Sequence, residues 1–318
     1  MRWTLKTAPN LSLVDQLSEA LSIDKIISKL LVQRGIHTFE QAKKFFRPSL
    51  DDLHDPFLLK DMDIAVSRIE RAIANNENIL IYGDYDVDGT TAVSLVSSYL
   101  KTITNQIATY IPDRYNEGYG ISYQGIDFAA DNNFSLIIAL DCGIKALEKV
   151  NYASQKNIDF IICDHHKPGD KIPKAAAVLN PKRKDCSYPF DELCGCGVGF
   201  KLIQALASKR GQTLEDLTAY LDLVATAIAA DIVPITGENR ILTYFGLQVI
   251  NSNPRNGIKA IIQGVKKNIL TITDVVFIIA PRINAAGRMK HGNYAVELLS
   301  EMDYEAAVDF AASIEKFN

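Results

Sequence analysis

The sequence lacks the long apolar segment that a membrane-spanning helix requires. None of its apolar runs approaches the ~18 residues that such a helix needs. The N-terminal stretch MRWTLKTAPNLSLVDQLSEA also lacks the continuous apolar core and the small-residue cleavage site of a secretory signal peptide. We therefore expect a cytoplasmic protein that does not act at a membrane.

The sequence also has few cysteines and no excess of positive charge. Its five cysteines are an odd number, and without an export signal they are expected to stay reduced. The spacing of Cys186, Cys194 and Cys196 matches no zinc-binding pattern. The net charge of −4 argues against a broadly basic surface that coats nucleic acid. Nucleic acid is not excluded, because two divalent cations in a cleft would offset that charge.

Residues 1–77 have a helical pattern. Apolar residues recur at helical spacing in residues 24–33. Thr38 and Gln41 have the spacing of a capping box that opens a second helix. A third helix is expected at residues 62–74. We interpret residues 1–77 as a helical N-terminal region that packs on the core.

From residue 79 onward, short apolar runs alternate with helical patterns. An apolar run followed directly by a polar turn is typical of a buried strand in a parallel sheet. Five such strands with helical crossovers predict an α/β fold, with a doubly wound, mainly parallel five-stranded sheet. The expected strands are residues 79–82, 107–111, 135–140, 159–163 and 176–179.

After a loop rich in cysteine and proline, the sequence becomes helical again. One helix of this C-terminal segment runs into Asp231 and is ended by Pro234. A loop that carries Arg282 and Arg288 is expected before the last helical pattern. The expected helices are residues 198–210, 213–230, 238–251, 255–263 and 304–317.

Three aspartates, Asp84, Asp86 and Asp88, alternate directly after the first strand. At an effective dielectric near 20, two carboxylates ~4 Å apart repel each other by about 4 kcal/mol, so the group favours a cation. Gly89-Thr90-Thr91 is expected to form a turn that leads into a helix. A solvated acidic loop is the simpler alternative. An EF-hand calcium loop does not fit, because Leu95 stands where that loop has a bidentate glutamate.

Two more strands end in acid or imidazole. The third expected strand runs into Asp141, and the fourth runs into Asp164, His165 and His166. Because the carboxyl ends of parallel strands lie at one edge of a sheet, these groups are expected to meet there. Carboxylates with an imidazole suit manganese, or magnesium with less preference for histidine. Asp231 is a candidate further ligand. Two ions held by shared carboxylates are the usual machinery for attack of water on phosphorus.

Six short segments carry a resemblance to a known family. GDYDVDGTTA, ALDCG, CDHH and AADIVP resemble, in this order, the four motifs of the DHH phosphoesterase superfamily. IPDRYNEGYG and APRINAAGRM resemble its RecJ branch, the bacterial exonucleases that degrade single-stranded DNA from the 5′ end. The resemblance spans roughly residues 75–318. It implies two-metal hydrolysis of phosphodiester bonds in DNA repair and recombination, with a single-strand-binding protein and a helicase as partners.

The resemblance implies a centre of two divalent cations, Mn²⁺ or Mg²⁺. Asp141 is expected to bridge them, and Asp84 is either a ligand or a group that supports one. Asp164 is expected to orient His165 or its neighbours, and His166 is a candidate contact of the scissile phosphate. The expected metal ligands are Asp84, Asp86, Asp88, Asp141, His165 and Asp231. The expected catalytic residues are Asp86, Asp88, Asp141, His165, His166 and Asp231.

The resemblance also implies contacts with substrate phosphates. Arginine suits this role because its planar fork binds phosphate through two hydrogen bonds. The expected phosphate-binding residues are Arg114, Arg282, Asn284 and Arg288. One departure concerns Tyr82, which stands where many other DHH enzymes have a metal-binding histidine, and which implies a site organised differently from that of the small-molecule enzymes.

A larger departure concerns the end of the sequence. RecJ-like proteins continue into a second domain with a glycine-rich nucleic-acid-binding motif and then an OB-fold, and neither is present here. We expect residues 78–302 to be the DHH phosphoesterase catalytic domain and residues 303–318 the start of a linker helix to the absent second domain. Hydrolysis is then expected to be weak and poorly processive. Two alternatives stay open: a phosphodiesterase of short oligonucleotides, cyclic dinucleotides or pyrophosphate, and a catalytically silent nucleic-acid-binding relative.

Overall fold

The computed structural model describes residues 4, 6–289 and 292–315, apart from the side chains of residues 287–289 and 315. The chain divides into two compact units, Met1–Leu53 and His54–Asn318. Each unit has a buried hydrophobic cluster of its own. No helix in these described ranges is both long enough and apolar enough to span a membrane.

The first unit is built from short helices around a small core that includes Leu17 and Leu31. The sequence predicted its second and third helices, and the capping box of Thr38 with Gln41 is confirmed. Its first helix, which the pattern did not single out, is capped by Asn10, whose side chain accepts a hydrogen bond from the first turn. The elements are α1 (Leu11–Leu21), α2 (Lys25–Val32), α3 (Phe39–Phe46) and the 3-10 turn η1 (Leu50–Asp52).

The second unit is built on a five-stranded sheet with the order β2-β1-β3-β4-β5. All four neighbouring pairs are parallel, which confirms the sheet that the sequence predicted. The carboxyl ends of all five strands therefore lie at one edge. The strands are β1 (Asn78–Gly83), β2 (Ile107–Tyr110), β3 (Phe134–Leu140), β4 (Asp159–Cys163) and β5 (Ala177–Leu179).

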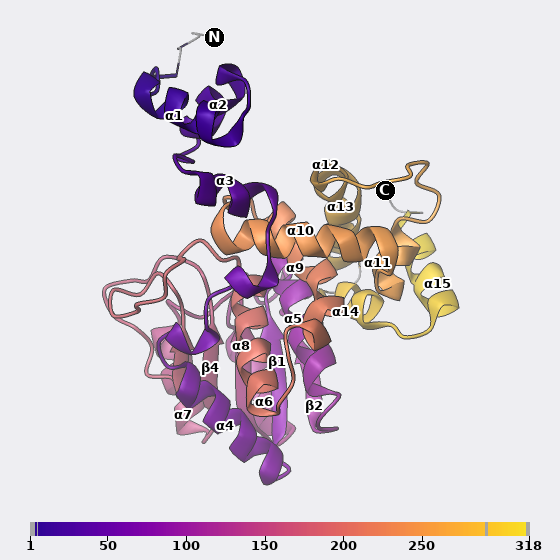
Figure 1. Ribbon diagram of the computed structural model, residues 1–318. Coiled ribbons are helices and arrows are strands. Elements are labelled where there is room, and N and C mark those ends of the chain that lie inside the picture. The colour runs from indigo at the N-terminus through magenta and orange to yellow at the C-terminus, as the bar shows by residue number, and fades with distance from the viewer. Residues whose placement is uncertain (1–3, 5, 290–291, 316–318) are drawn as a thin grey trace. The chain divides into compact units, whose positions relative to one another are not determined.

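Helices cover both faces of this sheet, as expected for a doubly wound fold (Figure 1). Leu80 and Tyr82 alternate along β1 and pack in one cluster with Ile126 of α6 and Val150 of α7. The opposite face is covered by α5 and α8, which pack on each other, and α4 packs on α8 and β5. The helices are α4 (Met62–Ala74), α5 (Val87–Leu100), α6 (Tyr123–Asp131), α7 (Leu147–Gln155) and α8 (Gly195–Lys209).

A second helical layer brings the C-terminal segment to the start of α5. Helix α9 packs on α5, and α10 packs on α9 (Figure 1). Helix α14 packs on α5 and α13, and α15 contacts α11, α13 and α14. The remaining elements are η2 (Pro56–Leu58), η3 (Glu215–Tyr220), α9 (Leu221–Ala230), α10 (Gly237–Ser252), α11 (Asn256–Ile261), α12 (Ile272–Asp274), the π-helical turn η4 (Val275–Ile279), α13 (Ala280–Met289), α14 (Gly292–Ser300) and α15 (Tyr304–Glu315).

The structure differs from the sequence prediction at three places. Residues 54–77 belong to the second unit rather than to an N-terminal region, because α4 is part of the helical cover of the sheet. Gly89-Thr90-Thr91 is not a turn, since α5 begins at Val87 and is capped by Asp86. The expected loop with Arg282 and Arg288 is wrong, because both residues lie in α13, which follows the π-helical turn η4 directly.

The contact between α9 and α10 gives a test of the second helical layer. A methyl group on Gly246 would lie 2.2 Å from the Leu221 carbonyl oxygen and 2.5 Å from the Ala225 Cβ atom. Gly246→Ala should therefore lower the free energy of unfolding by about 1–3 kcal/mol, measured by chemical denaturation. The direction of this change is informative, because replacing glycine by alanine normally stabilises a helix by about 1 kcal/mol.

Gly169→Ala is the matched control for this substitution. Its added methyl group would have its nearest neighbour at 3.8 Å, so the free energy of unfolding should change by less than about 0.5 kcal/mol. A Gly246→Ala protein as stable as the wild type would contradict the close packing of α9 on α10.

Candidate metal centre

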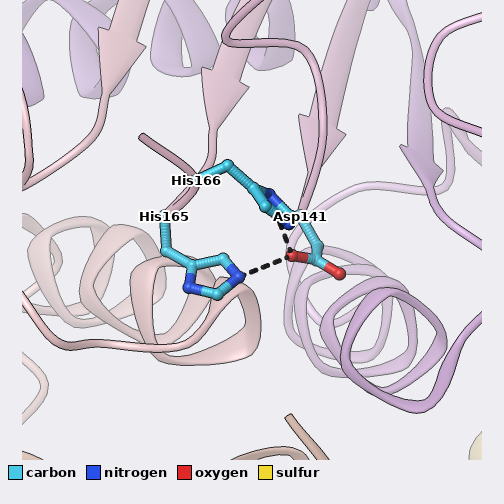
Figure 2. A group of neighbouring side chains, drawn as sticks. All are labelled: Asp141, His165 and His166. Carbon is cyan, nitrogen blue, oxygen red and sulfur yellow. Dashed lines mark ion pairs between the residues drawn. The ribbon is translucent and has the colours of Figure 1, made fainter. Parts of the chain in front are cut away.

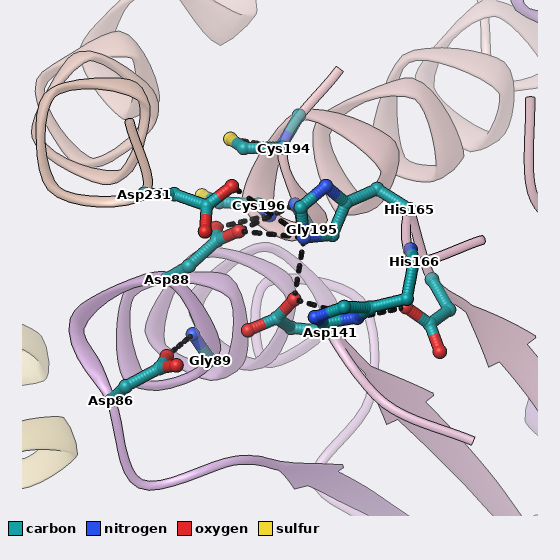
Figure 3. Close-up of polar contacts among 12 residues, drawn as sticks. Asp86, Asp88, Gly89, Asp141, His165, His166, Cys194, Gly195, Cys196 and Asp231 are labelled. Carbon is teal, nitrogen blue, oxygen red and sulfur yellow. Dashed lines mark hydrogen bonds and ion pairs between the residues drawn. The ribbon is translucent and has the colours of Figure 1, made fainter. Parts of the chain in front are cut away.

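Carboxylates and imidazoles from four segments meet beyond the carboxyl ends of the central strands (Figure 3). Asp88 lies in the first turn of α5, which directly follows β1. Asp141 follows β3, and His165 and His166 follow β4. Asp231 arrives from the end of α9, in the second helical layer. The convergence that the sequence predicted from strand ends is therefore present in the fold.

Asp88 is held by the N-terminus of α8. Its Oδ2 atom accepts a hydrogen bond of 2.6 Å from the Gly195 amide, and its Oδ1 atom accepts one of 2.7 Å from the Cys196 amide. The start of a helix carries unpaired amides and a partial positive charge, so it stabilises a carboxylate placed there. This fixes the direction of the Asp88 carboxylate although the side chain is almost fully buried.

Asp141 has an unusual backbone conformation that aims its carboxylate at the histidines. Its φ angle is 58°, in the left-handed region, and its amide donates a 2.8 Å hydrogen bond to the Cys163 carbonyl of the neighbouring strand. Its Oδ1 atom lies 3.2 Å from His165 Nε2 and 3.9 Å from His166 Nδ1 (Figure 2). That buried oxygen has no hydrogen-bond partner in the part of the chain that the structure describes.

His165 lies at the centre of the group. Its Nε2 atom is also 3.5 Å from Asp231 Oδ2 and 3.7 Å from Asp88 Oδ2. Among the described residues, the Nε2 atom of His165 and the Oδ2 atom of Asp231 are buried without a hydrogen-bond partner. Buried polar atoms normally have partners, so these atoms mark a place where a ligand is required.

The donor atoms form two overlapping sets that fit a divalent cation. In each set, one ligand atom per residue lies within 4.8 Å of the others. Carboxylate oxygens with imidazole nitrogen are a donor set suited to manganese, with magnesium favoured less by the imidazole. The first set is Asp141, His165 and His166, and the second is Asp88, His165 and Asp231.

The charges in this cluster shift the pKa values in the directions expected without a cation. Burial, with the charges of Asp231 and Asp86, raises the pKa of Asp88 to about 8. Burial raises the pKa of Asp141 strongly, with the charge of Asp88 acting in the same direction. Burial, then the charge of Asp86, raises the pKa of Asp231 to about 6. The carboxylates therefore bind protons readily at neutral pH, which is the behaviour of a site that prefers a positive charge.

The two histidines are in opposite electrostatic situations. Burial, with the charge of His166, lowers the pKa of His165 to about 4, so its ring is neutral and offers a lone pair. The hydrogen bond between His166 Nδ1 and Asp164 Oδ1, 2.8 Å long, raises the pKa of His166. Burial alone would raise the pKa of Asp164. The hydrogen bonds and the charge of His166 together have a larger, opposite effect, so the pKa of Asp164 is lowered.

Comparison with known proteins agrees with this geometry. The sequence model of the DHH family, N-terminal domain, matches residues 78–228. This match assigns residues 78–228 to the DHH family. The whole chain is 40% identical to the single-stranded-DNA-specific exonuclease RecJ of Bacillus subtilis, over 100% of this chain and 40% of that protein.

Solved structures of DHH proteins also resemble this chain. The crystal structures of RecJ from Thermus thermophilus in complex with Mn²⁺ and with Mg²⁺ align with TM-scores of 0.84 and 0.74, at 26% and 25% identity. Each alignment covers 99% of this chain, and 45% and 42% of the two solved chains. The chain thus spans less than half the length of both relatives.

The other acids of the DHH motifs hold the backbone around the centre. Asp84 accepts hydrogen bonds from the Tyr85 amide at Oδ1 and from the Gly120 amide at Oδ2, and it is in neither ligand set. Asp86 caps α5 through the Gly89 amide. Asp164 accepts from the Ile144 and His166 amides, so it holds His166 rather than His165.

The structure places two of the residues expected to bind phosphate in different cavities. Asn284 lines a cavity of about 140 Å³ with Asp86, Asp88 and Asp231, whereas Arg282 lines a different groove with Phe277. The Arg114 guanidinium lies over the Tyr85 ring, with its Cζ atom 4.2 Å from the ring centroid. Arg288 lies in α13, but its side chain is outside the described residues.

Gly195 is a site residue that the sequence did not reveal. A methyl group there would lie 2.5 Å from both Cβ and Oδ1 of Asp141, so only glycine lets α8 approach β3 closely enough for its amide to reach Asp88. The Gly-Cys-Gly sequence at this point favoured a loop, and the expected helix began at residue 198. The sequence shows that Gly195 is a glycine, which is a signal of close backbone approach. It does not show that Asp141 is the residue that approaches.

Substitution of Gly195 tests this close approach. Gly195→Ala should displace Asp141 or Asp88, and should abolish the rise in melting temperature that Mn²⁺ produces in the wild-type protein. Gly197→Ala is the matched control in the same helix turn, because its methyl group would meet its nearest neighbour at an ordinary 3.4 Å. A full Mn²⁺-induced shift in the Gly195→Ala protein would contradict the assigned geometry.

The raised carboxylate pKa values also predict how metal-free stability depends on pH. Unfolded aspartate titrates near pH 3.9 and histidine near pH 6.5. Burial raises the folded-state pKa of Asp84 to about 7, and that of Asp88 is about 8. The folded chain therefore binds more protons than the unfolded chain between about pH 6.5 and pH 8, so stability falls as pH rises. His165, whose pKa is lowered, acts in the opposite direction only below about pH 6.5.

Thermal melting in EDTA across that window measures this effect. The melting temperature should decrease from about pH 6.5 to about pH 8, and saturating Mn²⁺ should reduce the decrease, because the cation replaces the protons. A melting temperature in EDTA that stays constant or rises over this window would show that the buried carboxyls are not protonated in the folded state.

Proposed function

We propose that this chain is the catalytic part of a metal-dependent exonuclease that hydrolyses single-stranded DNA from its 5′ end. The observation that carries the proposal is a group of buried donor atoms that have no hydrogen-bond partner among the described residues: Asp141 Oδ1, His165 Nε2 and Asp231 Oδ2. Such a group favours a cation, and a carboxylate-imidazole centre at the carboxyl edge of an α/β sheet suits hydrolysis at phosphorus.

The similarity to RecJ supports the choice of substrate. The relative from Bacillus subtilis is named a single-stranded-DNA-specific exonuclease, and two similar structures are described as complexes with Mn²⁺ and Mg²⁺. Because this chain spans 40% of the first of these proteins, its own activity on DNA is part of the proposal. We propose Mn²⁺ or Mg²⁺ as its cofactor, with two ions bound.

The residues proposed to hold these ions come from the two donor sets and their neighbour Asp86. Bound together, two such ions would activate water and stabilise the charge that develops on the phosphoryl group. The hydrogen bond with Asp164 raises the pKa of His166, which favours a positive group where it can meet a phosphate oxygen. The proposed ligands are Asp86, Asp88, Asp141, His165 and Asp231. The bridging position of Asp141 stays a prediction.

Asp84 has a different proposed role from the other acids. Its two oxygens hold the Tyr85 and Gly120 amides, so it fixes the loop that contains Arg114. We propose that it positions this loop for phosphate binding instead of binding metal. Asn284 is proposed to contact substrate at the centre, since it lines the same cavity as Asp88 and Asp231.

The wider assignments of the family resemblance also stay predictions. They include the single-strand-binding protein and the helicase as partners, and the cytoplasmic location. Residues 78–302 are proposed as the catalytic domain, and residues 303–318 as the start of a linker helix. Limited proteolysis followed by mass spectrometry would locate the boundaries of the resistant core.

A cleavage assay with several substrates tests the activity. With Mn²⁺, early release of labelled mononucleotide from a 5′-labelled single strand is expected, with less from a 3′-labelled strand or a duplex. Turnover of only a dinucleotide, a cyclic dinucleotide or pyrophosphate would instead assign a small-molecule phosphodiesterase. Binding of the single strand with no turnover of any substrate would assign a silent nucleic-acid-binding relative.

Asp231→Asn tests the ligand assignment without disturbing a backbone contact. Loss of a metal ligand should lower kcat/KM on the single strand by more than about a hundredfold. The reason is that loss of a residue that only hydrogen-bonds to a metal ligand already lowers activity by about 10- to 100-fold. Its melting temperature in EDTA should be unchanged or higher, because the charge of Asp231 raises the pKa of Asp88 by repulsion. The exposed Asp170→Asn is the matched control. Near-normal activity of Asp231→Asn would remove Asp231 from the proposed centre.

A further inference from the structure

Lys182 lies at the opposite edge of the sheet from Arg114. It follows β5, which is one edge strand, whereas Arg114 follows β2, which is the other. Three residues of the candidate centre follow the strands between them: Asp88 follows β1, Asp141 follows β3 and His165 follows β4. The sequence motifs drew attention to Arg114 but not to Lys182.

The backbone at Lys182 is tied to the DHH segment. The Lys182 amide donates a 2.8 Å hydrogen bond to Asn180 Oδ1, and Asn180 Nδ2 donates a 2.9 Å hydrogen bond to the His166 carbonyl. Asn180 is fully buried, and Pro181 between the two residues is also buried. The base of the lysine side chain is therefore fixed next to the two histidines.

The ammonium group of Lys182 is weakly engaged, and its side chain starts from a segment that is hydrogen-bonded to the His166 backbone. Among the described residues it has one ionic partner, Glu192 Oε2, at 3.8 Å, which is too long for a hydrogen bond. Its hydrogen-bond donors are thus left for another group.

A cation in this position opposes metal binding unless an anion is also bound. Its charge repels a divalent ion held by His165 and Asp231, so a lysine there weakens the metal-binding site. A phosphate next to the metal reverses this effect, because the ammonium and the metal ion then attract the same anion.

We propose that Lys182 binds a backbone phosphate of the single strand on the β5 side of the metal centre. This inference rests on the proposed function. The strand would cross the carboxyl edge of the sheet from Arg114 to Lys182. Four strand spacings of about 4.8 Å separate the two edge strands, or about 19 Å, so a path of this length accommodates several phosphates and not a single nucleotide.

Salt dependence of binding, without cleavage, tests this contact. The probe is a phosphorothioate-linked thymidine oligonucleotide with a 5′-phosphate, bound in Mn²⁺ over a series of salt concentrations. The logarithm of the binding constant falls linearly with the logarithm of the salt concentration. For single strands, each lost phosphate contact makes this slope less steep by about 0.7. Lys182→Ala should lose about that amount and bind about tenfold more weakly at low salt. Lys182→Arg should keep the wild-type slope.

Lys184→Ala is the matched control, since Lys184 is an exposed lysine two positions away. It should keep the wild-type slope and affinity. The affinity for Mn²⁺, measured calorimetrically without DNA, is a second readout, and it should not fall when the affinity for DNA falls. Lys182→Ala should bind Mn²⁺ as tightly as the wild type or more tightly, because a repelling charge has been removed.

The outcomes separate this inference from the proposed function. Equal salt slopes for the wild type and Lys182→Ala would overturn the phosphate contact. If Lys182→Ala also bound Mn²⁺ more tightly, the only role of Lys182 would be to offset the negative charge of the carboxylates. Weaker Mn²⁺ binding by Lys182→Ala would also overturn the contact, because the lysine would then support the centre itself. A wild-type protein that neither binds nor cleaves the single strand would instead overturn the proposed function.

Discussion

The second unit depends on the grouping of several carboxylates in a place where water cannot screen them. Burial raises the pKa values of Asp88, Asp141 and Asp231, so each charge is costly in the folded state. The fold offsets this cost for Asp88 with two amides at the N-terminus of α8. Within the described residues, no amide reaches Asp141 Oδ1 or Asp231 Oδ2. The carboxylates are thus positioned by the protein, and their charge is left for a cation to neutralise.

This arrangement requires the backbones of three elements to approach closely. The N-termini of α5 and α8 meet at the end of β3, and the space between them excludes a side chain at Gly195. Gly89 has the same role beside β1, because a methyl group there would lie 2.5 Å from the Asp84 carbonyl oxygen. Asp141 adopts a left-handed conformation at the same point. The site geometry and the packing of the two central helices are therefore one structural feature.

The strands and the acids at their ends could be predicted from the sequence because both signals are local. An apolar run such as residues 135–140 defines a buried strand, and the next residue, Asp141, then lies at a known edge. Gly89 and Gly195 could not be interpreted in this way, because the atoms that exclude a side chain there belong to other elements of the fold. Arg282 and Asn284 were grouped by one motif, and only the helical structure of α13 shows that they line different cavities. Contacts across the fold decide these cases.

The order of the strands also separates charge of opposite sign across the sheet. The acids follow the three central strands, while Arg114 and Lys182 follow the two edge strands. Negative charge at the centre favours divalent cations, and positive charge at the rim favours an anionic chain that passes over them. A protein with a net charge of −4 needs no basic surface for this purpose if, as proposed, two cations and two rim residues act along one path. A mononucleotide would reach the centre and at most one rim residue, so this distribution of charge favours a polymer over a small phosphate ester.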